Sequence, residues 1–251
     1  MIPGCLVASM LGGGAGGVDA ADFDGTNDYA TRGAGLTNAA DSKLFTFVMW
    51  TKADAVGGRY FTGVTTLGGS TLRFSVHEQS GVFFLQASSP GGTNILNINT
   101  TTAPSTTAWQ CLMCSVDLAD TAKRHLYLGD TNELNVNTYT DAAIDFTLAD
   151  WAVGARPDGS GKHDGGLAEM YFWTDAYIDL SVLANRRLFI SNLGQPAGPG
   201  GAVSALGIPD VRFHLNDGET ANNFVANVGN GDGGAFTVTG ALSTYASSPS
   251  D

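Results

Sequence analysis

Hydrophobic and polar residues alternate along much of the chain, and this period of two predicts β-strands rather than helices. The segment 45–50 is apolar at almost every position, which predicts a central strand buried on both faces. In 72–77 and 93–102, apolar residues alternate with polar ones, so each of these strands is expected to turn one face to solvent. The polar positions are Arg73, Ser75, His77, Asn97 and Asn99.

Turn-forming residues separate these segments. Clusters of Gly, Asp and Asn fall between the strands, where turns need them. The chain has 251 residues, of which 34 are Gly, and only 14% are charged, so the regular Glu, Lys, Leu and Ala spacing of long helices is missing. The pattern predicts an all-β fold with roughly 12–16 strands in two stacked antiparallel sheets.

One segment breaks the alternation. The stretch DLSVLANRRLFISNLGQP places leucines at helical spacing and predicts one short helix near 180–192. Asp179 is expected to cap its N-terminus and Gly194 to close its C-terminus. The Gly- and Pro-rich residues 195–209 are expected to form a linker. Residues 208–251 are expected to form strands that complete the sheets or pack on them.

The charge balance argues against a nucleic-acid partner, and the hydropathy of the chain argues against a membrane partner. The chain carries 24 Asp and Glu residues against 12 Lys and Arg, a formal net charge of −12. Nucleic-acid binding needs clustered Lys and Arg to neutralise phosphates, and the basic residues here are scattered. No apolar run approaches the roughly 18 residues that a membrane span needs. The sequence therefore predicts neither a nucleic-acid partner nor a membrane partner.

The first residues are predicted to form an N-terminal docking arm over 1–20. No Lys or Arg precedes their short apolar core, so they make a poor secretory signal. The core is too short to fold alone and predicts burial against a partner surface, including a further copy of the chain in a homo-oligomer. The Gly-rich residues 12–17 are expected to tether it to the first strand. The predicted assembly contacts are Ile2, Cys5, Leu6, Val7, Met10 and Leu11.

Two cysteines, Cys111 and Cys114, form a C-x-x-C motif that in other settings binds zinc or does redox chemistry. Their surroundings, WQCLMCSVD, have the pattern of a strand, where side chains three positions apart point to opposite faces. No second Cys pair or nearby His completes a zinc site. The preferred interpretation is a pair of buried structural thiols, and no metal-binding residue is assigned.

Acidic residues would form a calcium site only if the fold brought them together, because calcium takes about six to eight oxygen ligands. The stretch RPDGSGKHDGG supplies Asp158 and Asp164 without EF-hand spacing, and Asp24, Asp28 and Asp117 would have to converge from distant segments. The stretch DFDGTNDYA is interpreted as strand, turn and strand, since Asp and Asn side chains bond local backbone N–H groups in turns. No cofactor is predicted, and calcium is left as an alternative.

Five motifs, taken in order, resemble those of one family. Laminin-G-like domains, which have a concanavalin A-like jelly-roll fold, show F-D-G-x-x-D-Y, F-T-x-x-x-W, W-x-x-x-x-x-V-D, L-Y-x-D-G and G-x-x-x-E-x-x-x-W. The resemblance implies a jelly-roll sandwich over 21–251, but no single function, because this fold serves lectins, glycanases and adhesion modules. The matching stretches are DFDGTNDYA (22–30), FTFVMWTKA (45–53), WQCLMCSVD (109–117), LYLGD (126–130) and GGLAEMYFWTDAYI (165–178).

The C-terminal part resembles laminin-G-like proteins encoded by tailed phages and prophages. The matching stretches are YIDLSVLANRRLFISNLGQP (177–196) and NFVANVGNGDGGAFTVTGALS (223–243). This resemblance implies a non-enzymatic virion structural protein, such as a capsid decoration, spike or tail accessory protein. Its localisation would be the virion, and its partners would be other virion proteins and further copies of itself.

A carbohydrate-binding module for a host surface glycan, with calcium as an optional aid, is the alternative function. Aromatic residues such as Tyr139, Trp151 or Tyr177 would stack on sugar rings if exposed, although no glycan-binding residue is assigned. Glycanases of this fold carry a strand with E-x-D-x-x-E or E-x-D-x-E, which this chain lacks, and Glu169 matches the family's structural glutamate. G-x-S-x-G and H-E-x-x-H are absent too, so no catalytic residue and no enzyme activity are predicted.

Overall fold

The computed structural model of the protein describes residues 18–216, 219–226 and 234–251. The predicted assembly contacts Ile2, Cys5, Leu6, Val7, Met10 and Leu11 lie outside these described residues, so the docking arm stays a prediction. The described residues form two β-sheets and three short helical segments.

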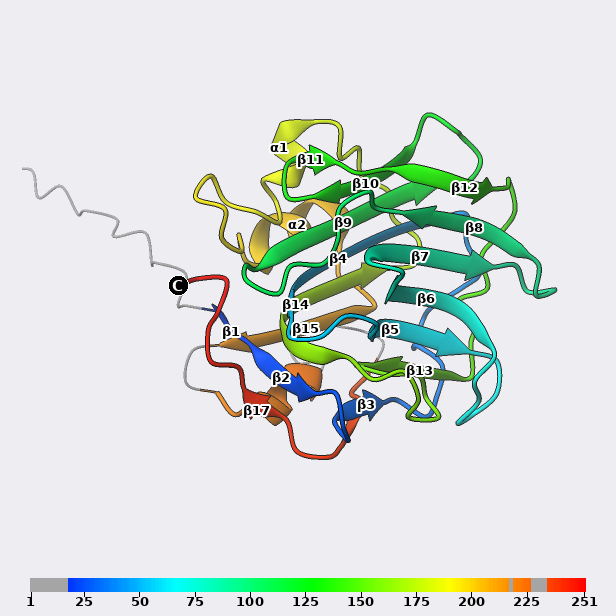
Figure 1. Ribbon diagram of the computed structural model, residues 1–251. Helices are drawn as coiled ribbons and strands as arrows, with labels where there is room; N and C mark the ends of the chain where they lie inside the picture. The colour runs from blue at the N-terminus through cyan, green and yellow to red at the C-terminus, as the bar shows by residue number, and fades with distance from the viewer. Residues whose placement is uncertain (1–17, 217–218, 227–233) are drawn as a thin grey trace, which may run out of the picture.

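The two sheets lie face to face (Figure 1), and every strand pairing is antiparallel. The nine-stranded sheet has the order β1-β15-β14-β4-β9-β10-β11, with β2 beside β14 and β17 beside β2. Its strands are β1 (Val18–Asp19), β2 (Ala21–Asp24), β4 (Leu44–Ala53), β9 (Gln110–Asp117), β10 (Arg124–Leu128), β11 (Thr131–Asn132), β14 (Asp164–Trp173), β15 (Val211–Asn216) and β17 (Ser243–Thr244).

The eight-stranded sheet has the order β12-β8-β7-β6-β5-β13-β3-β16. Its strands are β3 (Tyr29–Thr31), β5 (Arg59–Val64), β6 (Leu72–Gln79), β7 (Val82–Ser88), β8 (Asn94–Asn99), β12 (Asn135–Tyr139), β13 (Asp150–Val153) and β16 (Thr237–Thr239). Three of the seventeen strands are two residues long, so fourteen have three residues or more. The predicted all-β sandwich of two antiparallel sheets is confirmed.

Aromatic side chains fill the space between the sheets. The Phe172 ring of β14 lies 4.9 Å from that of Phe74 and 5.5 Å from that of Phe61, measured between centroids. Trp151 of β13 stacks on Phe61 at 5.2 Å and is fully buried. It faces inward opposite Gly63, where a side chain would collide with the indole. Trp151 is therefore a core residue and does not meet the condition of exposure that sugar stacking requires.

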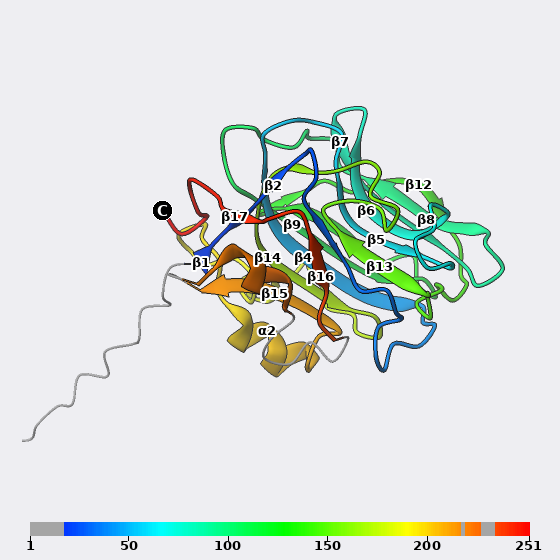
Figure 2. The same ribbon diagram turned by 90° about the horizontal axis from the view of Figure 1, so that it is seen from below.

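Residues 174–207, which we call the covering segment, form a third layer on the outer face of the nine-stranded sheet (Figure 2). The segment contains α1 (Leu183–Arg186) and α2 (Pro199–Leu206). Two indole N–H groups fasten it: Trp173 Nε1 donates to the Gly207 carbonyl at 2.9 Å, and Trp50 Nε1 to the Phe189 carbonyl at 3.4 Å. The buried strand residues beneath it include Val48, Trp50, Cys111, Met113, Tyr127, Ala168, Tyr171 and Trp173.

Helical structure in this segment differs from the sequence prediction in two ways. The helix expected near 180–192 spans only α1, because Asp179 does not cap it but accepts a hydrogen bond from the Ser181 backbone N–H at 2.8 Å in the preceding turn. The linker expected over 195–209 contains α2, which has a proline in its first turn and Gly207, at a φ of 82°, directly after its end. Within the described ranges, no helix is long and apolar enough to cross a membrane.

The C-terminal part of the chain pairs with both sheets. Strand β15 lies between β14 and β1, β17 pairs with β2, and β16 pairs with β3 of the other sheet. The 3₁₀-helix η1 (Ala221–Ala226) buries Phe224, whose ring lies 5.6 Å from that of Phe213 in β15. These contacts place β16 and β17 at the edge of the sandwich beside β3 and β2.

Candidate functional site

The outer face of the eight-stranded sheet, which we call the polar face, carries side chains in two cross-strand rows. Paired residues of antiparallel strands point to the same face, so the register identifies each row. The inward positions between them hold core residues such as Val76, Leu85 and Ile98. From β5 through β12, the first row is Arg59, His77, Phe84, Asn99 and Asn135. From β5 to β8, the second row is Thr62, Ser75, Gln86 and Asn97.

A loop covers one end of the polar face. Residues 154–163, between β13 and β14, lie over β5, where Thr62 Oγ1 donates to the Ala155 carbonyl at 2.9 Å. The same loop brings Arg156 beside Arg59, whose pKa is lowered by burial and by the positive charge of Arg156. The β6, β7, β8 and β12 part of the face lies beyond this loop.

His77 and Phe84 form a stacked pair in the first row. Their ring centroids are 5.5 Å apart and the ring planes differ by 15°. His77 Nδ1 lies 3.0 Å from Ser75 Oγ. The pKa of His77 is lowered to about 3, first by burial and then by the positive charges of Arg59 and Arg156, while hydrogen bonds with Gln79 and Ser75 oppose the shift. At neutral pH the imidazole is therefore uncharged, and it supports the half-buried Phe84 ring from one side.

Four asparagines form a hydrogen-bonded group at the other end of the face. Asn135 Nδ2 and Asn137 Nδ2 both donate to Asn99 Oδ1, at 3.0 and 2.8 Å. Asn137 Nδ2 also lies 3.3 Å from Asn97 Oδ1. A β-bulge in β12 turns Asn137 toward these partners. Side-chain amides offer both donors and acceptors, so this group presents mixed polarity to solvent.

A hollow of about 150 Å³ lies on the polar face across β6, β7 and β8. It is smaller than the roughly 300–1,000 Å³ of a pocket for a drug-sized ligand, and its size suits one ring or one polar substituent of a larger molecule. The residues that line it are Leu72, Arg73, Phe74, Ser75, Gln86, Ser88 and Asn94.

Two larger hollows lie on the side of the covering segment. One, of about 580 Å³, is bounded by the loop 187–197, and the other, of about 240 Å³, lies beside Trp109. Their polar side chains are engaged within the protein: Arg187 binds Asp130 at 2.7 Å, and Gln110 Oε1 accepts a backbone N–H at 2.6 Å. We therefore place the candidate site on the polar face, where side chains of mixed polarity converge.

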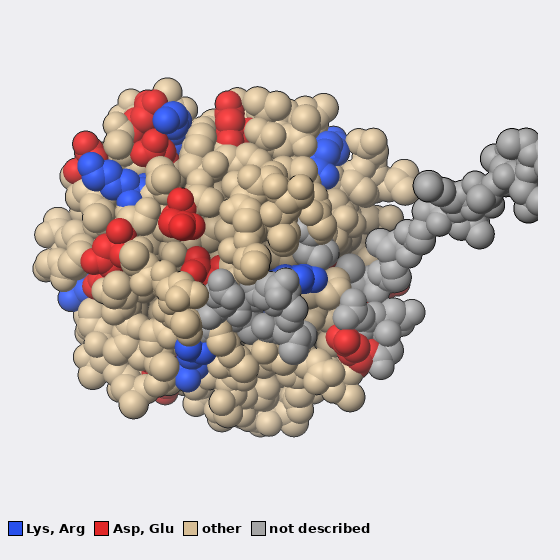
Figure 3. All heavy atoms as spheres, turned by 180° about the vertical axis from the view of Figure 1, so that it is seen from behind, with Lys and Arg blue, Asp and Glu red and all other residues tan. Residues whose placement is uncertain are grey.

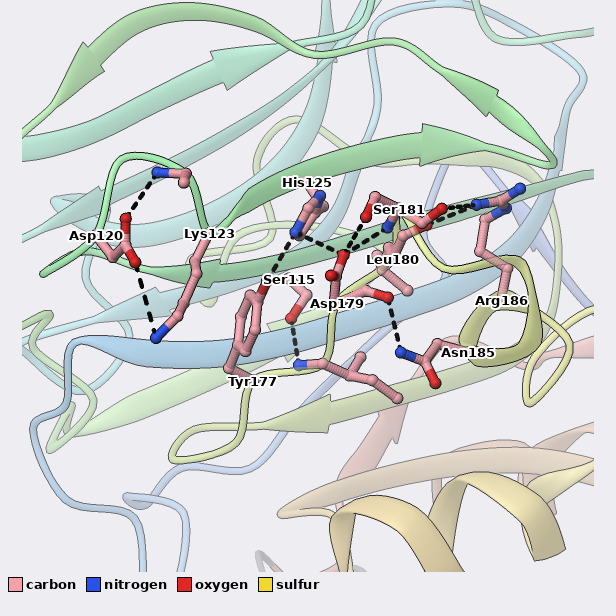
Figure 4. Close-up of polar contacts among 12 residues, drawn as sticks. Ser115, Asp120, Lys123, His125, Tyr177, Asp179, Leu180, Ser181, Asn185 and Arg186 are labelled. Atoms are coloured by element: carbon pink, nitrogen blue, oxygen red, sulfur yellow. Dashed lines mark hydrogen bonds and ion pairs between the residues drawn. The ribbon is translucent and has the colours of Figure 1, made fainter.

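The two tyrosines considered for sugar stacking lie away from the polar face. Tyr139 of β12 packs toward the core and its hydroxyl donates to the Asp117 carbonyl at 2.7 Å. Tyr177 belongs to the covering segment, and its hydroxyl lies 2.8 Å from His125 Nε2 (Figure 4). Both hydroxyls hold elements of the fold together.

Figure 4 shows the polar contacts that fix the covering segment to β9 and β10. The Ile178 N–H donates to Ser115 Oγ at 2.9 Å, and Asn185 Nδ2 donates to the Asp179 carbonyl at 2.8 Å. Asp179 Oδ1 lies 3.3 Å from His125 Nε2; burial lowers the pKa of His125, and the Asp179 charge opposes that shift. These contacts close the outer face of the nine-stranded sheet.

Sequence alternation identified part of the polar face. It placed Arg73, Ser75 and His77 on one side of a strand, as the structure does, but only Arg73 is half-exposed, because neighbouring side chains cover Ser75 and His77. It did not single out Phe84 or Gln86 as site residues, because they meet the asparagines of β8 only through the register of three strands. The alternation of apolar and polar residues shows which side chains of one strand share a face. It does not show which strands pair, or in which register.

The structure brings together only some of the acidic residues considered for calcium. Asp24 and Asp164 are register partners of β2 and β14, and burial raises the pKa of Asp164, with further contributions from Asp54 and Asp24. Asp24 Oδ1 accepts the Thr26 backbone N–H at 2.8 Å, as the turn interpretation requires. Asp28, Asp117 and Asp158 do not join this pair in a ligand set: within the described residues, no three His, Cys, Asp or Glu side chains are placed to hold a metal.

Cys111, Cys114 and Glu169 are buried. Cys111 faces the covering segment and Cys114 faces the core between the sheets, so the predicted divergence of the two thiols is confirmed. Burial raises the pKa of both thiols. Glu169 is 1% exposed and its Oε1 lies 3.2 Å from His214 Nδ1. That the protein is not an enzyme stays a prediction.

Comparison with known proteins identifies the family. Residues 24–182 match a family model described as the concanavalin A-like lectin/glucanases superfamily, and the chain belongs to this family. The matched region contains most of the polar face and ends within the covering segment. A search of curated proteins finds no match.

Solved structures share the fold at low sequence identity. A candidate carbohydrate-binding protein from Bacteroides ovatus ATCC 8483 is 13% identical, with a TM-score of 0.59; the match covers 93% of this chain and 61% of that one. The CBM40 of the Ruminococcus gnavus IT-sialidase, solved with α2,3-sialyllactose, is 12% identical, with coverages of 67% and 96% and a TM-score of 0.47. A heptameric pentraxin from Limulus polyphemus is 14% identical, with coverages of 65% and 78% and a TM-score of 0.46.

Proposed function

We propose that the protein binds carbohydrate, without catalysis, on the polar face. The observation that carries this proposal is the pair of cross-strand rows. The Phe84 ring lies in register with the Asn99 amide in one row, and the other row holds hydroxyls and amides. Sugars need this combination, because their C–H faces pack on aromatic rings while their hydroxyls both donate and accept hydrogen bonds. Membership in a lectin and glucanase superfamily supports the proposal, as does the similarity to the candidate carbohydrate-binding protein from Bacteroides ovatus.

A glycan array with the full-length protein, followed by calorimetry on the glycans that bind, tests this function. Phe84→Ala and Gln86→Ala are each expected to weaken binding about two- to tenfold, since each removes one stacking or hydrogen-bonding contact. Asn192→Ala, in the loop beside the hollow of about 580 Å³, is the matched control and should bind like wild type. An EDTA arm tests the calcium-assisted form. If no glycan binds, or if only Asn192→Ala weakens binding, the proposal is wrong.

We also infer, from the sequence resemblance of 177–196 and 223–243 alone, that the protein works in a phage virion, where the polar face would contact a host surface glycan. Other virion proteins and further copies of this chain would be its partners. Deleting residues 1–17 should leave a folded β-domain that no longer joins its particle or oligomer, measured by circular dichroism, size and particle incorporation. Normal assembly of the truncated protein would contradict the docking arm.

A further inference from the structure

We propose that the polar face selects sugars that carry an anionic group, a carboxylate or a sulfate ester, and that Arg59 and Arg73 bind this group. The inference rests on the proposed function and narrows it to one substrate class. It follows from three observations on this face: the distribution of charge, the geometry around Ser75, and the electrostatic surroundings of His77.

The charge of the polar face is opposite to that of the whole chain. The formal net charge is −12, yet neither polar row contains Asp or Glu, while Arg59, Arg73 and Arg156 lie on or beside the rows. The charge of Arg73 acts on the Asp145 carboxyl and that of Arg156 on the Asp158 carboxyl, so an acidic group lies near each of these two arginines. In the part of the chain that the structure describes, none of these three arginines forms an ion pair.

The opposite side of the molecule is arranged differently. There, basic and acidic side chains lie interspersed (Figure 3). Arg186 and Arg187 of the covering segment both bind the Asp130 carboxylate, at 3.0 and 2.7 Å. The guanidinium donors of Arg186 and Arg187 are thus engaged with a carboxylate, whereas in the described residues no carboxylate forms an ion pair with Arg59, Arg73 or Arg156.

Ser75 connects two of these arginines to the hollow. Its hydroxyl lies 3.4 Å from a terminal nitrogen of Arg59, and both Ser75 and Arg73 line the hollow of about 150 Å³. The Arg73 guanidinium lies against Gly92, whose positive φ of 84° and missing side chain leave room for it. Among the described residues, the Arg73 side chain makes no hydrogen bond, and its Nε is buried without a partner. An anionic group in the hollow would therefore meet the Arg73 guanidinium of β6, which lines it, while the Arg59 guanidinium of β5 contacts Ser75 in the same lining. Guanidinium groups bind carboxylate and sulfate oxygens well.

His77 reports the same positive potential. After burial, the charges of Arg59 and Arg156 are the next causes that keep its pKa near 3. A bound anion would offset those charges and raise the pKa of the imidazole, whereas a neutral sugar would leave that contribution in place. The ring is thus a built-in probe that distinguishes charge recognition from sugar binding in general.

The test compares neutral glycans with glycans that carry an anionic group. Full-length protein is titrated by calorimetry with lactose and sialyllactose, with galactose and galacturonic acid oligosaccharides, and with a galactose 6-sulfate glycan. Wild type is expected to bind the charged member of at least one pair about tenfold more tightly, and added salt should reduce this preference. The carboxylate and sulfate arms show which anion the site accepts. NMR of His77 should show an upward pKa shift with the charged glycan only.

Arg73→Gln and Arg59→Gln are expected to remove the preference, so that each variant binds the charged and the neutral member of a pair with affinities within about twofold of one another. Lys43→Gln, which removes one positive charge at the start of β4 outside the polar face, is the matched control and should keep the preference. Equal binding of neutral and charged glycans, or a preference that survives in Arg73→Gln, overturns this inference and leaves the proposed function standing. Failure of both kinds of glycan to bind overturns both.

Discussion

The two sheets share one core but turn contrasting outer faces away from it. On the nine-stranded sheet the outward side chains are apolar, among them Val48, Trp50 and Trp173, and the covering segment buries them. On the eight-stranded sheet the corresponding positions hold polar residues such as Ser75, Gln86 and Asn97. Burying apolar surface is favourable, whereas burying a polar group without a partner is costly, so only the first face attracts a third layer. The chemistry of alternate residues thus decides which face stays available to a ligand.

The largest loss of stability is expected from a substitution beneath the covering segment, on the outer face of the nine-stranded sheet. Trp173→Ala removes a buried indole that packs on Phe189 and donates to the Gly207 carbonyl. It should lower the free energy of unfolding by about 3–5 kcal/mol, measured by urea denaturation. Trp173→Phe, which keeps most of the packing, should cost clearly less. A loss below 1 kcal/mol for the alanine variant would mean that the covering segment adds little stability.

Acid is expected to weaken the fold through buried histidines. Burial lowers the pKa of His163 to about 3 from its ordinary value of 6.5, so the unfolded chain takes up a proton that the folded protein does not. Stability is then greatest above about pH 6.5 and falls as the pH drops. Between pH 7 and pH 5 the loss from this residue should be about 2 kcal/mol, measured by urea denaturation at both values.

His163→Gln should remove this part of the pH dependence, whatever it does to stability at pH 7. His77 shifts in the same direction but lies on the polar face, so its share of the pH dependence should shrink when an anionic glycan binds. A pH dependence that is unchanged in His163→Gln would show that other groups cause the acid sensitivity.

Sequence alone gives the class of the fold because alternation and turn residues are local signals. Phe45, Phe47 and the opposed Cys111 and Cys114 follow that rule directly. The helices of the covering segment are harder to predict from sequence because they are short. Their ends are set by tertiary contacts, such as those of Asp179, and by burial on the sheet. The polar face is the hardest part to predict from sequence. Its residues come from four hairpin-connected strands, and which of them are neighbours depends on the register of those strands.

A smaller effect is expected from one hydrogen bond beneath the covering segment. Ser115→Ala removes the acceptor for the Ile178 N–H and a partner of Thr46, all in a buried position. The unpaired groups should cost about 1–2 kcal/mol in unfolding free energy, and limited proteolysis within 174–207 should become faster. Ser181→Ala, at an exposed position of the same segment, is the control and should change stability by less than about 0.5 kcal/mol.

The smallest change in stability is expected when a hydrogen-bonding side chain is removed from the polar face. Asn137 is exposed, and its amide donates to Asn99 Oδ1 at 2.8 Å and to Asn97 Oδ1 at 3.3 Å. In Asn137→Ala, water replaces the lost amide, so the unfolding free energy should change by less than about 0.5 kcal/mol. The Asn97 and Asn99 side chains, however, lose the partner that orients them, and glycan affinity should fall about two- to fivefold in calorimetry. If Asn137→Ala and Ser115→Ala destabilise the protein equally, the asparagine group serves the fold as the covered face does. A loss of affinity without a loss of stability assigns the group to binding.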